Sequence, residues 1–278
     1  MTRWHDIRTS LDDTVERFST LLHSVRDPAA RAVGTWSIAD TAAHVREVAT
    51  LNSTWATGGT PPPEFREAYE LASTVSVDHV NDVNALSLAA APERDLHALA
   101  GLIQERVELM LYLTAEADGS EPVCWLGGLK LPLAAVLAHT LSEVLVHGGD
   151  IARAERRSFP ITAVQARLIF EGFLFQLLTA ADASGFGGDR SDGMRPVACE
   201  LRLRDCERVL LVADQGRIRI EAPGARPADV HITADPAVMW LLMFNRIGPV
   251  GPALRGHVRV WGRRPWRLRH LVRLLQTP

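Results

Sequence analysis

Three residues near the middle of the chain, His139, Glu143 and His147, have the types and the spacing of metal ligands. Each lies four residues from the next, and in an α-helix a step of four returns nearly to the same face. Adjacent members of the series can therefore bind one ion. His139 and His147 are about 12 Å apart along a helix axis, which is too far for both to bind that ion comfortably. A further ligand must come from elsewhere in the chain, and His44 is the candidate.

The helix expected over residues 131–157 turns its acidic and imidazole groups toward apolar neighbours. Glu143, His147 and Asp150 share one stripe of this helix. The stripe is bordered by Leu137, Leu141, Val144 and Ile151. Such groups are costly to bury unless they are paired or bind a metal.

His44 can face this helix from a second helix, which is expected over residues 38–57. Ser37 is a good N-cap for it, and His44 aligns with Val48 and Leu51 on the inward face. Facing helices of a bundle are a recurrent place for metal sites. A site of two histidines and one glutamate results.

Catalytic zinc sites favour this ligand set, with three protein ligands and an open position for water or substrate. Iron, nickel or manganese would also accept it. Asp150 can hold the His147 imidazole as an acceptor or cap the next turn, and His139 can support the ligands in the same way. The spacing alone leaves another interpretation open, in which the histidines are hydrogen-bonded core residues and Glu143 pairs with an arginine.

Length and composition indicate an ordinary globular protein with two domains. The chain has 278 residues, of which 47% are hydrophobic and 23% charged, and a net charge of -3. This charge lacks the basic signature of nucleic-acid binding. The longest apolar stretch, residues 168–181, is interrupted by Glu171 and Gln176 and is too short to span a bilayer. We expect neither nucleic acid nor a membrane as the main partner, and a cytoplasmic location because the N-terminus lacks a secretion signal.

The cysteines form no metal motif. Cys124, Cys199 and Cys206 contain no CxxC pair, and their odd number fits a reducing compartment. Cys124 follows no obvious base and precedes Trp125, so we expect it to be an ordinary buried residue. Lys130 is the only lysine among 30 basic residues, which suggests a GC-rich source.

The hydrophobic period changes near residue 190, from helical spacing to the alternation of strands. Helices are expected over 4–24, 38–57, 94–117, 131–157 and 162–183. Strands are expected at ACELRLRD, RVLLVAD, GRIRIEA and DVHITAD, followed by a helix at 235–245, a strand at 255–260 and a closing helix from 265. The fold class is therefore α+β, with a four-helix bundle in residues 1–158 and a smaller α+β domain in residues 159–278.

Smaller features of the first half have weaker interpretations. The connection at 58–77 is too long for a plain bundle turn and is interpreted as a possible lid. Asn81 and Asn84 can line a sugar-binding pocket, although capping or surface exposure is the commoner role. Trp36 and Trp55 are expected to anchor the core at the two ends of the His44 helix, or to form a pocket wall.

Two segments of the chain, TWSIADTAAHV and HTLSEVLVHGGDIARA, carry a resemblance to a known family. Their pairing, followed by a mixed tail, resembles the DinB-like mycothiol-dependent maleylpyruvate isomerase family, and the likeness covers most of the chain. In that family a tryptophan-rich helix start leads to the first ligand histidine, and a late bundle helix carries the pattern ExxxHxxD. Here His44, Glu143, His147 and Asp150 occupy these positions. The C-terminal segment looks like the sterol-carrier-like domain that accompanies the bundle.

The resemblance implies a divalent metal, typically zinc, that activates the sulfur of mycothiol. The thiolate would attack a small-molecule electrophile, since a metal-bound thiol loses its proton. The variety of the family favours an S-transferase acting on a small metabolite or a secondary-metabolite intermediate. Cis–trans isomerisation of maleylpyruvate is the first alternative, and a non-catalytic metal, thiol or ligand carrier is the second. Either a monomer or a homodimer would serve.

Isomerisation of maleylpyruvate needs cationic groups for two carboxylates. The arginines that qualify by type and rough location are Arg153, Arg217, Arg219 and Arg246. A solvated surface position is the commoner role of such residues. No arginine of the family maps onto any of them.

Overall fold

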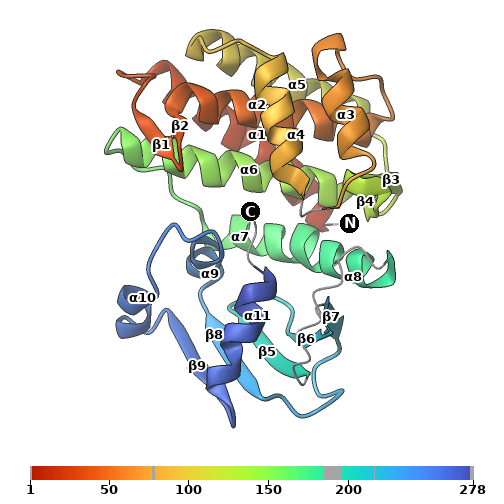
Figure 1. Ribbon diagram of the computed structural model, residues 1–278, viewed down its shortest axis with the longest axis vertical. Coiled ribbons are helices and arrows are strands. Elements are labelled where there is room, and N and C mark those ends of the chain that lie inside the picture. Colours follow the sequence, from red (N-terminus) through yellow and green to blue (C-terminus); the bar gives the residue numbers. More distant parts are fainter. Residues whose placement is uncertain (1, 77–78, 185–195, 216, 276–278) are drawn as a thin grey trace. The chain divides into compact units, whose positions relative to one another are not determined.

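The structure is a computed structural model that describes residues 2–76, 79–184, 196–215 and 217–275. The chain divides into two compact units, Met1–Ile161 and Thr162–Pro278; the sequence placed the boundary between residues 158 and 159. Helices and two short strand pairs make up the first unit, and the second combines helices with a larger sheet (Figure 1). The predicted α+β class, with a helical N-terminal part and a sheet in the C-terminal part, is confirmed.

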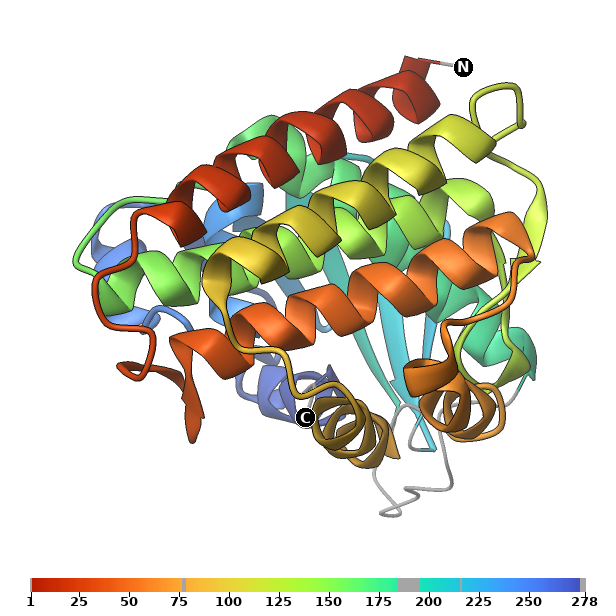
Figure 2. The same ribbon diagram turned by 90° about the horizontal axis from the view of Figure 1, so that it is seen from above.

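Four long helices dominate the first unit. They are α1 (Thr2–His23), α2 (Ile38–Thr57), α5 (Leu96–Leu113) and α6 (Leu133–Ala154). Both α1 and α2 contact α5 and α6, so the order around the bundle is α1, α5, α2, α6. Figure 2 shows these helices lying side by side. The apolar residues that recur at helical spacing in α1, such as Leu11, Phe18 and Leu22, are buried in the core.

Helix α2 has the start signal that its sequence predicts. The Ser37 hydroxyl accepts a hydrogen bond from the Asp40 backbone N–H, and the Asp40 carboxylate accepts one from the Ser37 N–H. Gly58 ends the helix with φ +63°, a conformation that favours glycine. A short strand pair, β1 (Arg31–Val33) and β2 (Trp36–Ser37), leads into it. This entry fixes where the His44 side chain lies.

The segment after α2 is not the open connection that its length suggested. It contains the 3-10 turn η1 (Pro63–Phe65) and helix α3 (Arg66–Ala72), and helix α4 (Val80–Ala90) follows. Phe65 and Ala72 are buried, and α4 packs on α2. The sequence analysis did not predict these helices, because helices this short carry too few apolar residues to show a period; the interpretation of the connection as a lid stays a prediction. Asn81 is exposed and Asn84 partly exposed on α4.

Gly148 of α6 has no side chain and so lets the ring of Phe159 lie close to the helix, whereas Gly149 has no such neighbour. A Cβ on Gly148 would lie 2.4 Å from Cε1 of Phe159, whereas one on Gly149 would meet nothing within 4 Å. We expect Gly149→Ala to raise the free energy of unfolding by up to about 1 kcal/mol through helix propensity. Gly148→Ala should lower it by about 1 kcal/mol net, because the Phe159 ring must move. Urea unfolding of the two variants measures both values, and equal shifts would contradict the close approach.

The second unit has a five-stranded sheet in the order β7-β6-β5-β8-β9. The strands are β5 (Val197–Leu203), β6 (Val209–Asp214), β7 (Arg217–Glu221), β8 (Val230–Ala234) and β9 (Val258–Trp261). β5 and β8 are parallel, and the other neighbours are antiparallel. All five correspond to strands predicted from the sequence. The predicted change of period near residue 190 lies outside the described residues.

The helices of this unit continue from the boundary. They are α7 (Ala163–Ile169), the π-turn η4 (Phe170–Leu174), α8 (Phe175–Ser184), α9 (Pro236–Met243), α10 (Val250–Leu254) and α11 (Leu268–Leu275). The first three follow one another without a break, as the predicted helix at 162–183 requires. The helix at 235–245 and the closing helix are also confirmed, whereas α10 was missed.

One helix, Ala163–Ala181, is long and apolar enough to cross a membrane by length and composition alone. This helix is longer than the apolar stretch of 168–181 that was counted in the sequence, because it begins at Ala163, five residues earlier. The evidence for a span is weak. The buried share of this helix is 44%, it carries Glu171, and α8 contacts strand β7. A helix that covers its own sheet has the same composition.

Candidate metal centre

His44, Glu143 and His147 converge inside the bundle. His44 comes from α2, and the other two residues lie one turn apart on α6. Their three ligand atoms all lie within 4.8 Å of one another. Nε2 of His44 and Nε2 of His147 are each 3.5 Å from the same oxygen, Oε2 of Glu143. The three residues meet because each lies on the helix face that the sequence predicts for it.

These distances suit one divalent ion. Zinc binds histidine nitrogen and carboxylate oxygen at about 2.0–2.2 Å, so two ligand atoms on a tetrahedral ion lie roughly 3.3–3.6 Å apart. The two 3.5 Å separations fall in that range. Both histidines are buried, with exposed fractions of 4% and 9%. The residues therefore fit a metal, and three protein ligands leave room for a further one.

Glu47 lies behind His44 and was missed by the sequence analysis. Its carboxylate Oε2 accepts a hydrogen bond from Nδ1 of His44 at 3.2 Å, and its side chain is buried. A proton held on Nδ1 leaves the lone pair of Nε2 for a metal. The available signal was the position of Glu47, three residues after His44 on the inward face of the same helix.

Asp150 lies behind His147, where the sequence predicted it. Its Oδ2 is 3.3 Å from Nδ1 of His147, and the carboxylate is fully buried. Nδ1 is itself buried and makes no well-aligned hydrogen bond in this arrangement, so Asp150 is the acceptor within reach. The other Asp150 oxygen pairs with Arg153. That pairing engages Arg153, one of the arginines considered for substrate carboxylates.

A chain of hydrogen bonds lies behind Glu143 and explains His139. Trp125 Nε1–H donates to Asn52 Oδ1 at 3.2 Å, and Asn52 Nδ2 donates to Nδ1 of His139 at 2.9 Å. Nδ1 of His139 is then the acceptor, so its Nε2 carries the proton. This Nε2–H faces Glu143 Oε1 at 3.5 Å. His139 therefore faces Glu143 and is not among the residues whose ligand atoms converge. We name Trp125, Asn52 and His139 the Glu143 relay.

Removing the middle of the Glu143 relay should weaken metal binding. Asn52→Leu leaves Trp125 Nε1 and His139 Nδ1 without this partner, so one of the contacts that orient the His139 ring is lost. We expect the metal dissociation constant to rise by about tenfold, the lower end of what supporting residues contribute. Chelator competition measures it. Asn81→Leu, at an exposed asparagine of α4, is the matched control, and equal affinity in both variants would contradict the supporting role.

The charges of the metal-free cluster are distributed unevenly. Burial alone would lower the pKa of His44, but the carboxylates of Glu143 and Glu47 outweigh it and raise the pKa to about 9. Burial opposes ionisation of Glu143, yet its contacts with His147 and His44 hold its pKa well below the usual range. Burial raises the pKa of Glu47 and lowers that of His139. The metal-free centre thus holds a buried imidazolium beside an ionised carboxylate.

Tryptophans border the centre. The Trp36 ring lies 4.9 Å from the His44 ring and 6.4 Å from the His147 ring, and it is partly exposed. Trp36 therefore forms a wall of the site. Trp55 is a core residue, 7% exposed, whose ring contacts those of Tyr69 and Trp125.

Cys124 is not the buried residue that the sequence suggested. It is exposed at the end of strand β3 (Pro122–Cys124). Lys130 of the paired strand β4 (Lys130–Pro132) lies opposite it, and its Nζ donates a hydrogen bond to Sγ at 2.9 Å. The short hairpin that joins them was not visible in the sequence.

The other arginines considered for carboxylate binding belong to the second unit. Arg219 contacts Glu221 and Asp214 there. Arg246 donates to the Phe244 carbonyl oxygen, and Arg217 is exposed on β7. The described structure assigns none of them to the metal centre.

Comparison with known proteins gives a distant likeness. No protein-family model and no curated protein matches this chain. A crystal structure of the mycothiol-dependent maleylpyruvate isomerase shares 16% identity, covers 86% of this chain and 87% of its own, and gives a TM-score of 0.46. A histidine-to-alanine mutant of the isomerase covers the same shares, with 16% identity and a TM-score of 0.47. Both carry the name of the family that the sequence resembles.

Proposed function

We propose that this protein is a divalent-metal enzyme that uses a low-molecular-weight thiol, mycothiol, as cosubstrate. The observation that carries the proposal is the convergence of His44, Glu143 and His147 on one point inside the bundle. Each ligand is backed by a separate polar side chain, as in functional metal sites. Zinc is the metal that this ligand set favours. We place the enzyme in a reducing cytoplasm, in keeping with its free cysteines.

The residues of this chain serve to hold an ion, to orient its ligands and to shield the site from water. When bound, a divalent ion favours the deprotonated form of a thiol ligand and so supplies a nucleophile near neutral pH. Glu47 and Asp150 contact Nδ1 of the two histidines, which would leave the Nε2 atoms to hold an ion. His139 holds the free oxygen of Glu143. The Trp36 ring covers one side of the histidine pair and limits access of water.

Two reactions are compatible with an activated thiol. In the first, addition to the cis double bond of maleylpyruvate and elimination after rotation give fumarylpyruvate and return the thiol; this is the reaction that names the resembled family. In the second, the sulfur stays on an electrophilic carbon, with either protonation of the neighbouring carbon or departure of a leaving group, and the product is a thioether. Arg153, the one candidate arginine of the first unit, is engaged by Asp150, which favours a substrate with fewer carboxylates and hence the second reaction.

Product analysis tests the proposal. The metal-loaded protein is incubated with mycothiol and either maleylpyruvate or a panel of uncharged electrophiles, and the products are identified by mass spectrometry. Fumarylpyruvate with full recovery of mycothiol identifies an isomerase, and a stable thioether identifies a transferase. Metal-loaded protein that binds mycothiol but forms neither product would overturn the enzymatic proposal in favour of a carrier. His147→Ala protein serves as the background in every reaction.

A further inference from the structure

The hairpin formed by β3 and β4 places a cysteine beside a lysine on the surface of the first unit. Cys124 and Lys130 are directly paired across the two strands, and residues paired in this way share a face. Nζ of Lys130 donates a hydrogen bond to Sγ of Cys124 at 2.9 Å, and both residues are exposed. A small molecule dissolved in water can therefore reach the sulfur while the amine is in contact with it.

The core of the first unit fixes the backbone that carries this pair. The Trp125 N–H donates to the Leu129 carbonyl oxygen at 2.8 Å and so closes the loop between the two strands. Trp125 and Leu129 are both buried, and the indole N–H of Trp125 donates to Asn52 of α2. The backbone positions of Cys124 and Lys130 thus follow from buried neighbours. Their contact does not require a flexible loop to become ordered.

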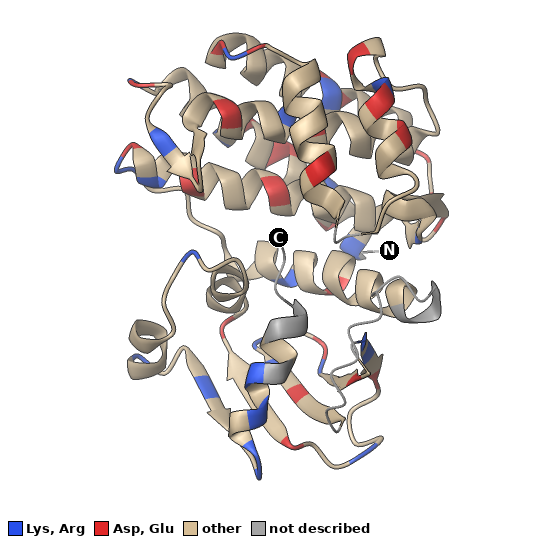
Figure 3. Cartoon of the chain, viewed as in Figure 1, with Lys and Arg blue, Asp and Glu red and all other residues tan. Residues whose placement is uncertain are grey.

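The amine of Lys130 is available to the sulfur. Figure 3 shows basic residues on both units, and in the sequence all of them except Lys130 are arginines. Arginines of the surface commonly pair with carboxylates, as Arg26 does with Glu155. Lys130 donates to sulfur instead, and it forms no ion pair with any carboxylate in the described part of the chain. An ammonium beside a cysteine favours the thiolate, which is the form that peroxides oxidise.

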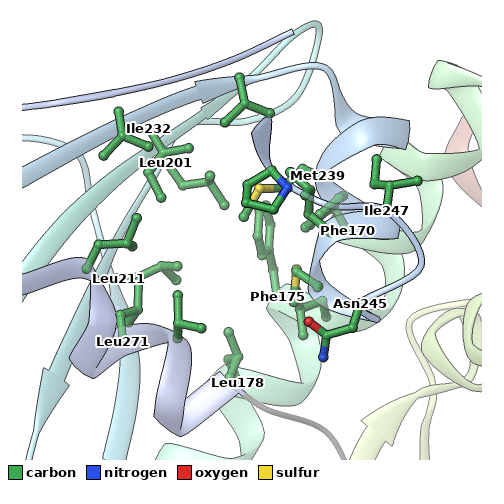
Figure 4. Close-up of a pocket in the computed structure, with 18 residues that line it drawn as sticks. Phe170, Phe175, Leu178, Leu201, Leu211, Ile232, Met239, Asn245, Ile247 and Leu271 are labelled. Atoms are coloured by element: carbon green, nitrogen blue, oxygen red, sulfur yellow. The ribbon is translucent and has the colours of Figure 1, made fainter. Parts of the chain in front are cut away.

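The other two cysteines lack this arrangement. Cys199 is buried in β5, two residues before Leu201 and on the same face of the sheet. That face borders the apolar cavity between the sheet and the helices of the second unit, which Figure 4 shows. Burial, with a contribution from Glu200, raises the pKa of Cys199 to about 12, so its thiol stays protonated. Cys206 is partly exposed, but the one lysine of the chain is engaged by Cys124.

We propose that hydrogen peroxide converts this pair into a reversible crosslink, a sulfenamide with a bond between Sγ of Cys124 and Nζ of Lys130. The thiolate attacks one peroxide oxygen, the O–O bond breaks, and a sulfenic acid forms as hydroxide leaves. The ammonium gives a proton to this hydroxide, which becomes water. The neutral amine then attacks the sulfur, the S–O bond breaks, and a second water leaves with a proton from the nitrogen. The sulfur loses two electrons, and the peroxide takes them up.

Thiols reverse the crosslink. A low-molecular-weight thiol attacks the sulfur, the S–N bond breaks, and the amine recovers its proton. A second thiol then releases Cys124 as a disulfide forms between the two small thiols. A free sulfenic acid proceeds instead to the irreversible sulfinic acid, so the crosslink protects Cys124 during exposure to peroxide. The pair contains none of the candidate metal ligands, and the crosslink does not depend on the proposed metal-dependent activity.

The single lysine gives a direct assay of the crosslink. A protease that cuts only after lysine divides the denatured, unaltered chain once, into residues 1–130 and 131–278. After the folded protein has been treated with hydrogen peroxide, we expect more than about half of the chain to resist this cut. Trypsin should then release the peptide 107–153 uncut and lighter by two hydrogen atoms, because arginines flank it. Excess thiol should restore both the mass and the cleavage.

Two outcomes would overturn the proposal. The first is complete cleavage at Lys130 in protein whose Cys124 has been oxidised, since an oxidised sulfur without the bond leaves the lysine accessible to the protease. The second is a Cys124 that remains a free thiol after peroxide treatment. Thiol titration of the same sample distinguishes the two.

Three variants separate oxidation from crosslinking. Lys130→Arg keeps a positive charge beside the sulfur but lacks the amine, so dimedone should trap several-fold more sulfenic acid at Cys124 than in the unaltered protein. Cys124→Ser should leave Lys130 fully cleavable after peroxide treatment. Cys206→Ser is the matched control at a partly exposed cysteine and should form the crosslink in full yield. Loss of the crosslink in Cys206→Ser, or equal trapping by dimedone with and without Lys130, would contradict the pairing. Circular dichroism confirms that each variant is folded.

Discussion

His147→Ala protein is expected to lose its metal and, with it, nearly all thiol-dependent turnover. The substitution removes one of three ligands and leaves Glu143 with a single histidine partner on the metal side. Purified protein should contain less than about 0.1 divalent ion per chain, compared with about one in the unaltered protein, and turnover should fall by a factor on the order of 10³. Elemental analysis and product formation measure the two quantities on the same sample.

The chain offers a close control for this experiment. His79 and Asp82 are also three residues apart, with Nδ1 and Oδ2 separated by 3.2 Å, but both side chains are mostly exposed. The pair reproduces the local geometry of His147 and Asp150 without a buried glutamate in front of it. His79→Ala should retain full metal content. Retention of the metal in His147→Ala would show that the ion binds elsewhere.

Metal affinity is expected to rise steeply with pH up to about pH 9. His44 must lose its proton to bind a metal through Nε2, and the neighbouring carboxylates raise its pKa from 6.5 to about 9. Below that pKa the metal displaces one proton from His44, so the apparent dissociation constant should fall about tenfold for each pH unit. Chelator competition between pH 6.5 and 8.5, corrected for the chelator's own protonation, measures the slope.

The free energy of unfolding of the metal-free protein should instead fall as the pH rises. A pKa raised in the folded state contributes stability that is fully present below pH 6.5 and is lost as the pH rises through about 9.

Glu47→Gln removes one of the two carboxylates that raise the pKa of His44. The steep region of metal binding should therefore move to lower pH in that variant. An affinity that stays constant from pH 6.5 to 8.5 would contradict a protonated His44.

The proposed metal ligands could be predicted from the sequence because the position of each depends on the spacing of residues within one helix. The spacing of four residues fixes Glu143 and His147 on one face of α6. The cap at Ser37 and the apolar residues of α2 indicate the inward face for His44. The same reasoning placed Asp150 behind His147. These features could be predicted because the helices are long and their apolar residues recur at a regular helical spacing.

The missed features depend on contacts between segments that are distant in the chain. Asn52 and Trp125 meet His139 only because the bundle packs α2 against α6 and the hairpin near its end. Lys130 lies beside Cys124 because two three-residue strands pair. The spacing of apolar residues within one segment does not show which distant segment it will contact. The cavity of the second unit was equally hidden, since a strand of apolar residues looks the same whether it packs on a helix or on empty space.

The two oxygens of Glu143 face different residues, and this limits how the carboxylate can bind an ion. Oε2 faces both histidines, and Oε1 faces His139. Chelation by both oxygens would take Oε1 away from His139, which Asn52 holds in place. The Glu143 relay would thus favour binding of an ion through Oε2 alone. A carboxylate that binds through one oxygen would leave more room at the ion for ligands from outside the chain.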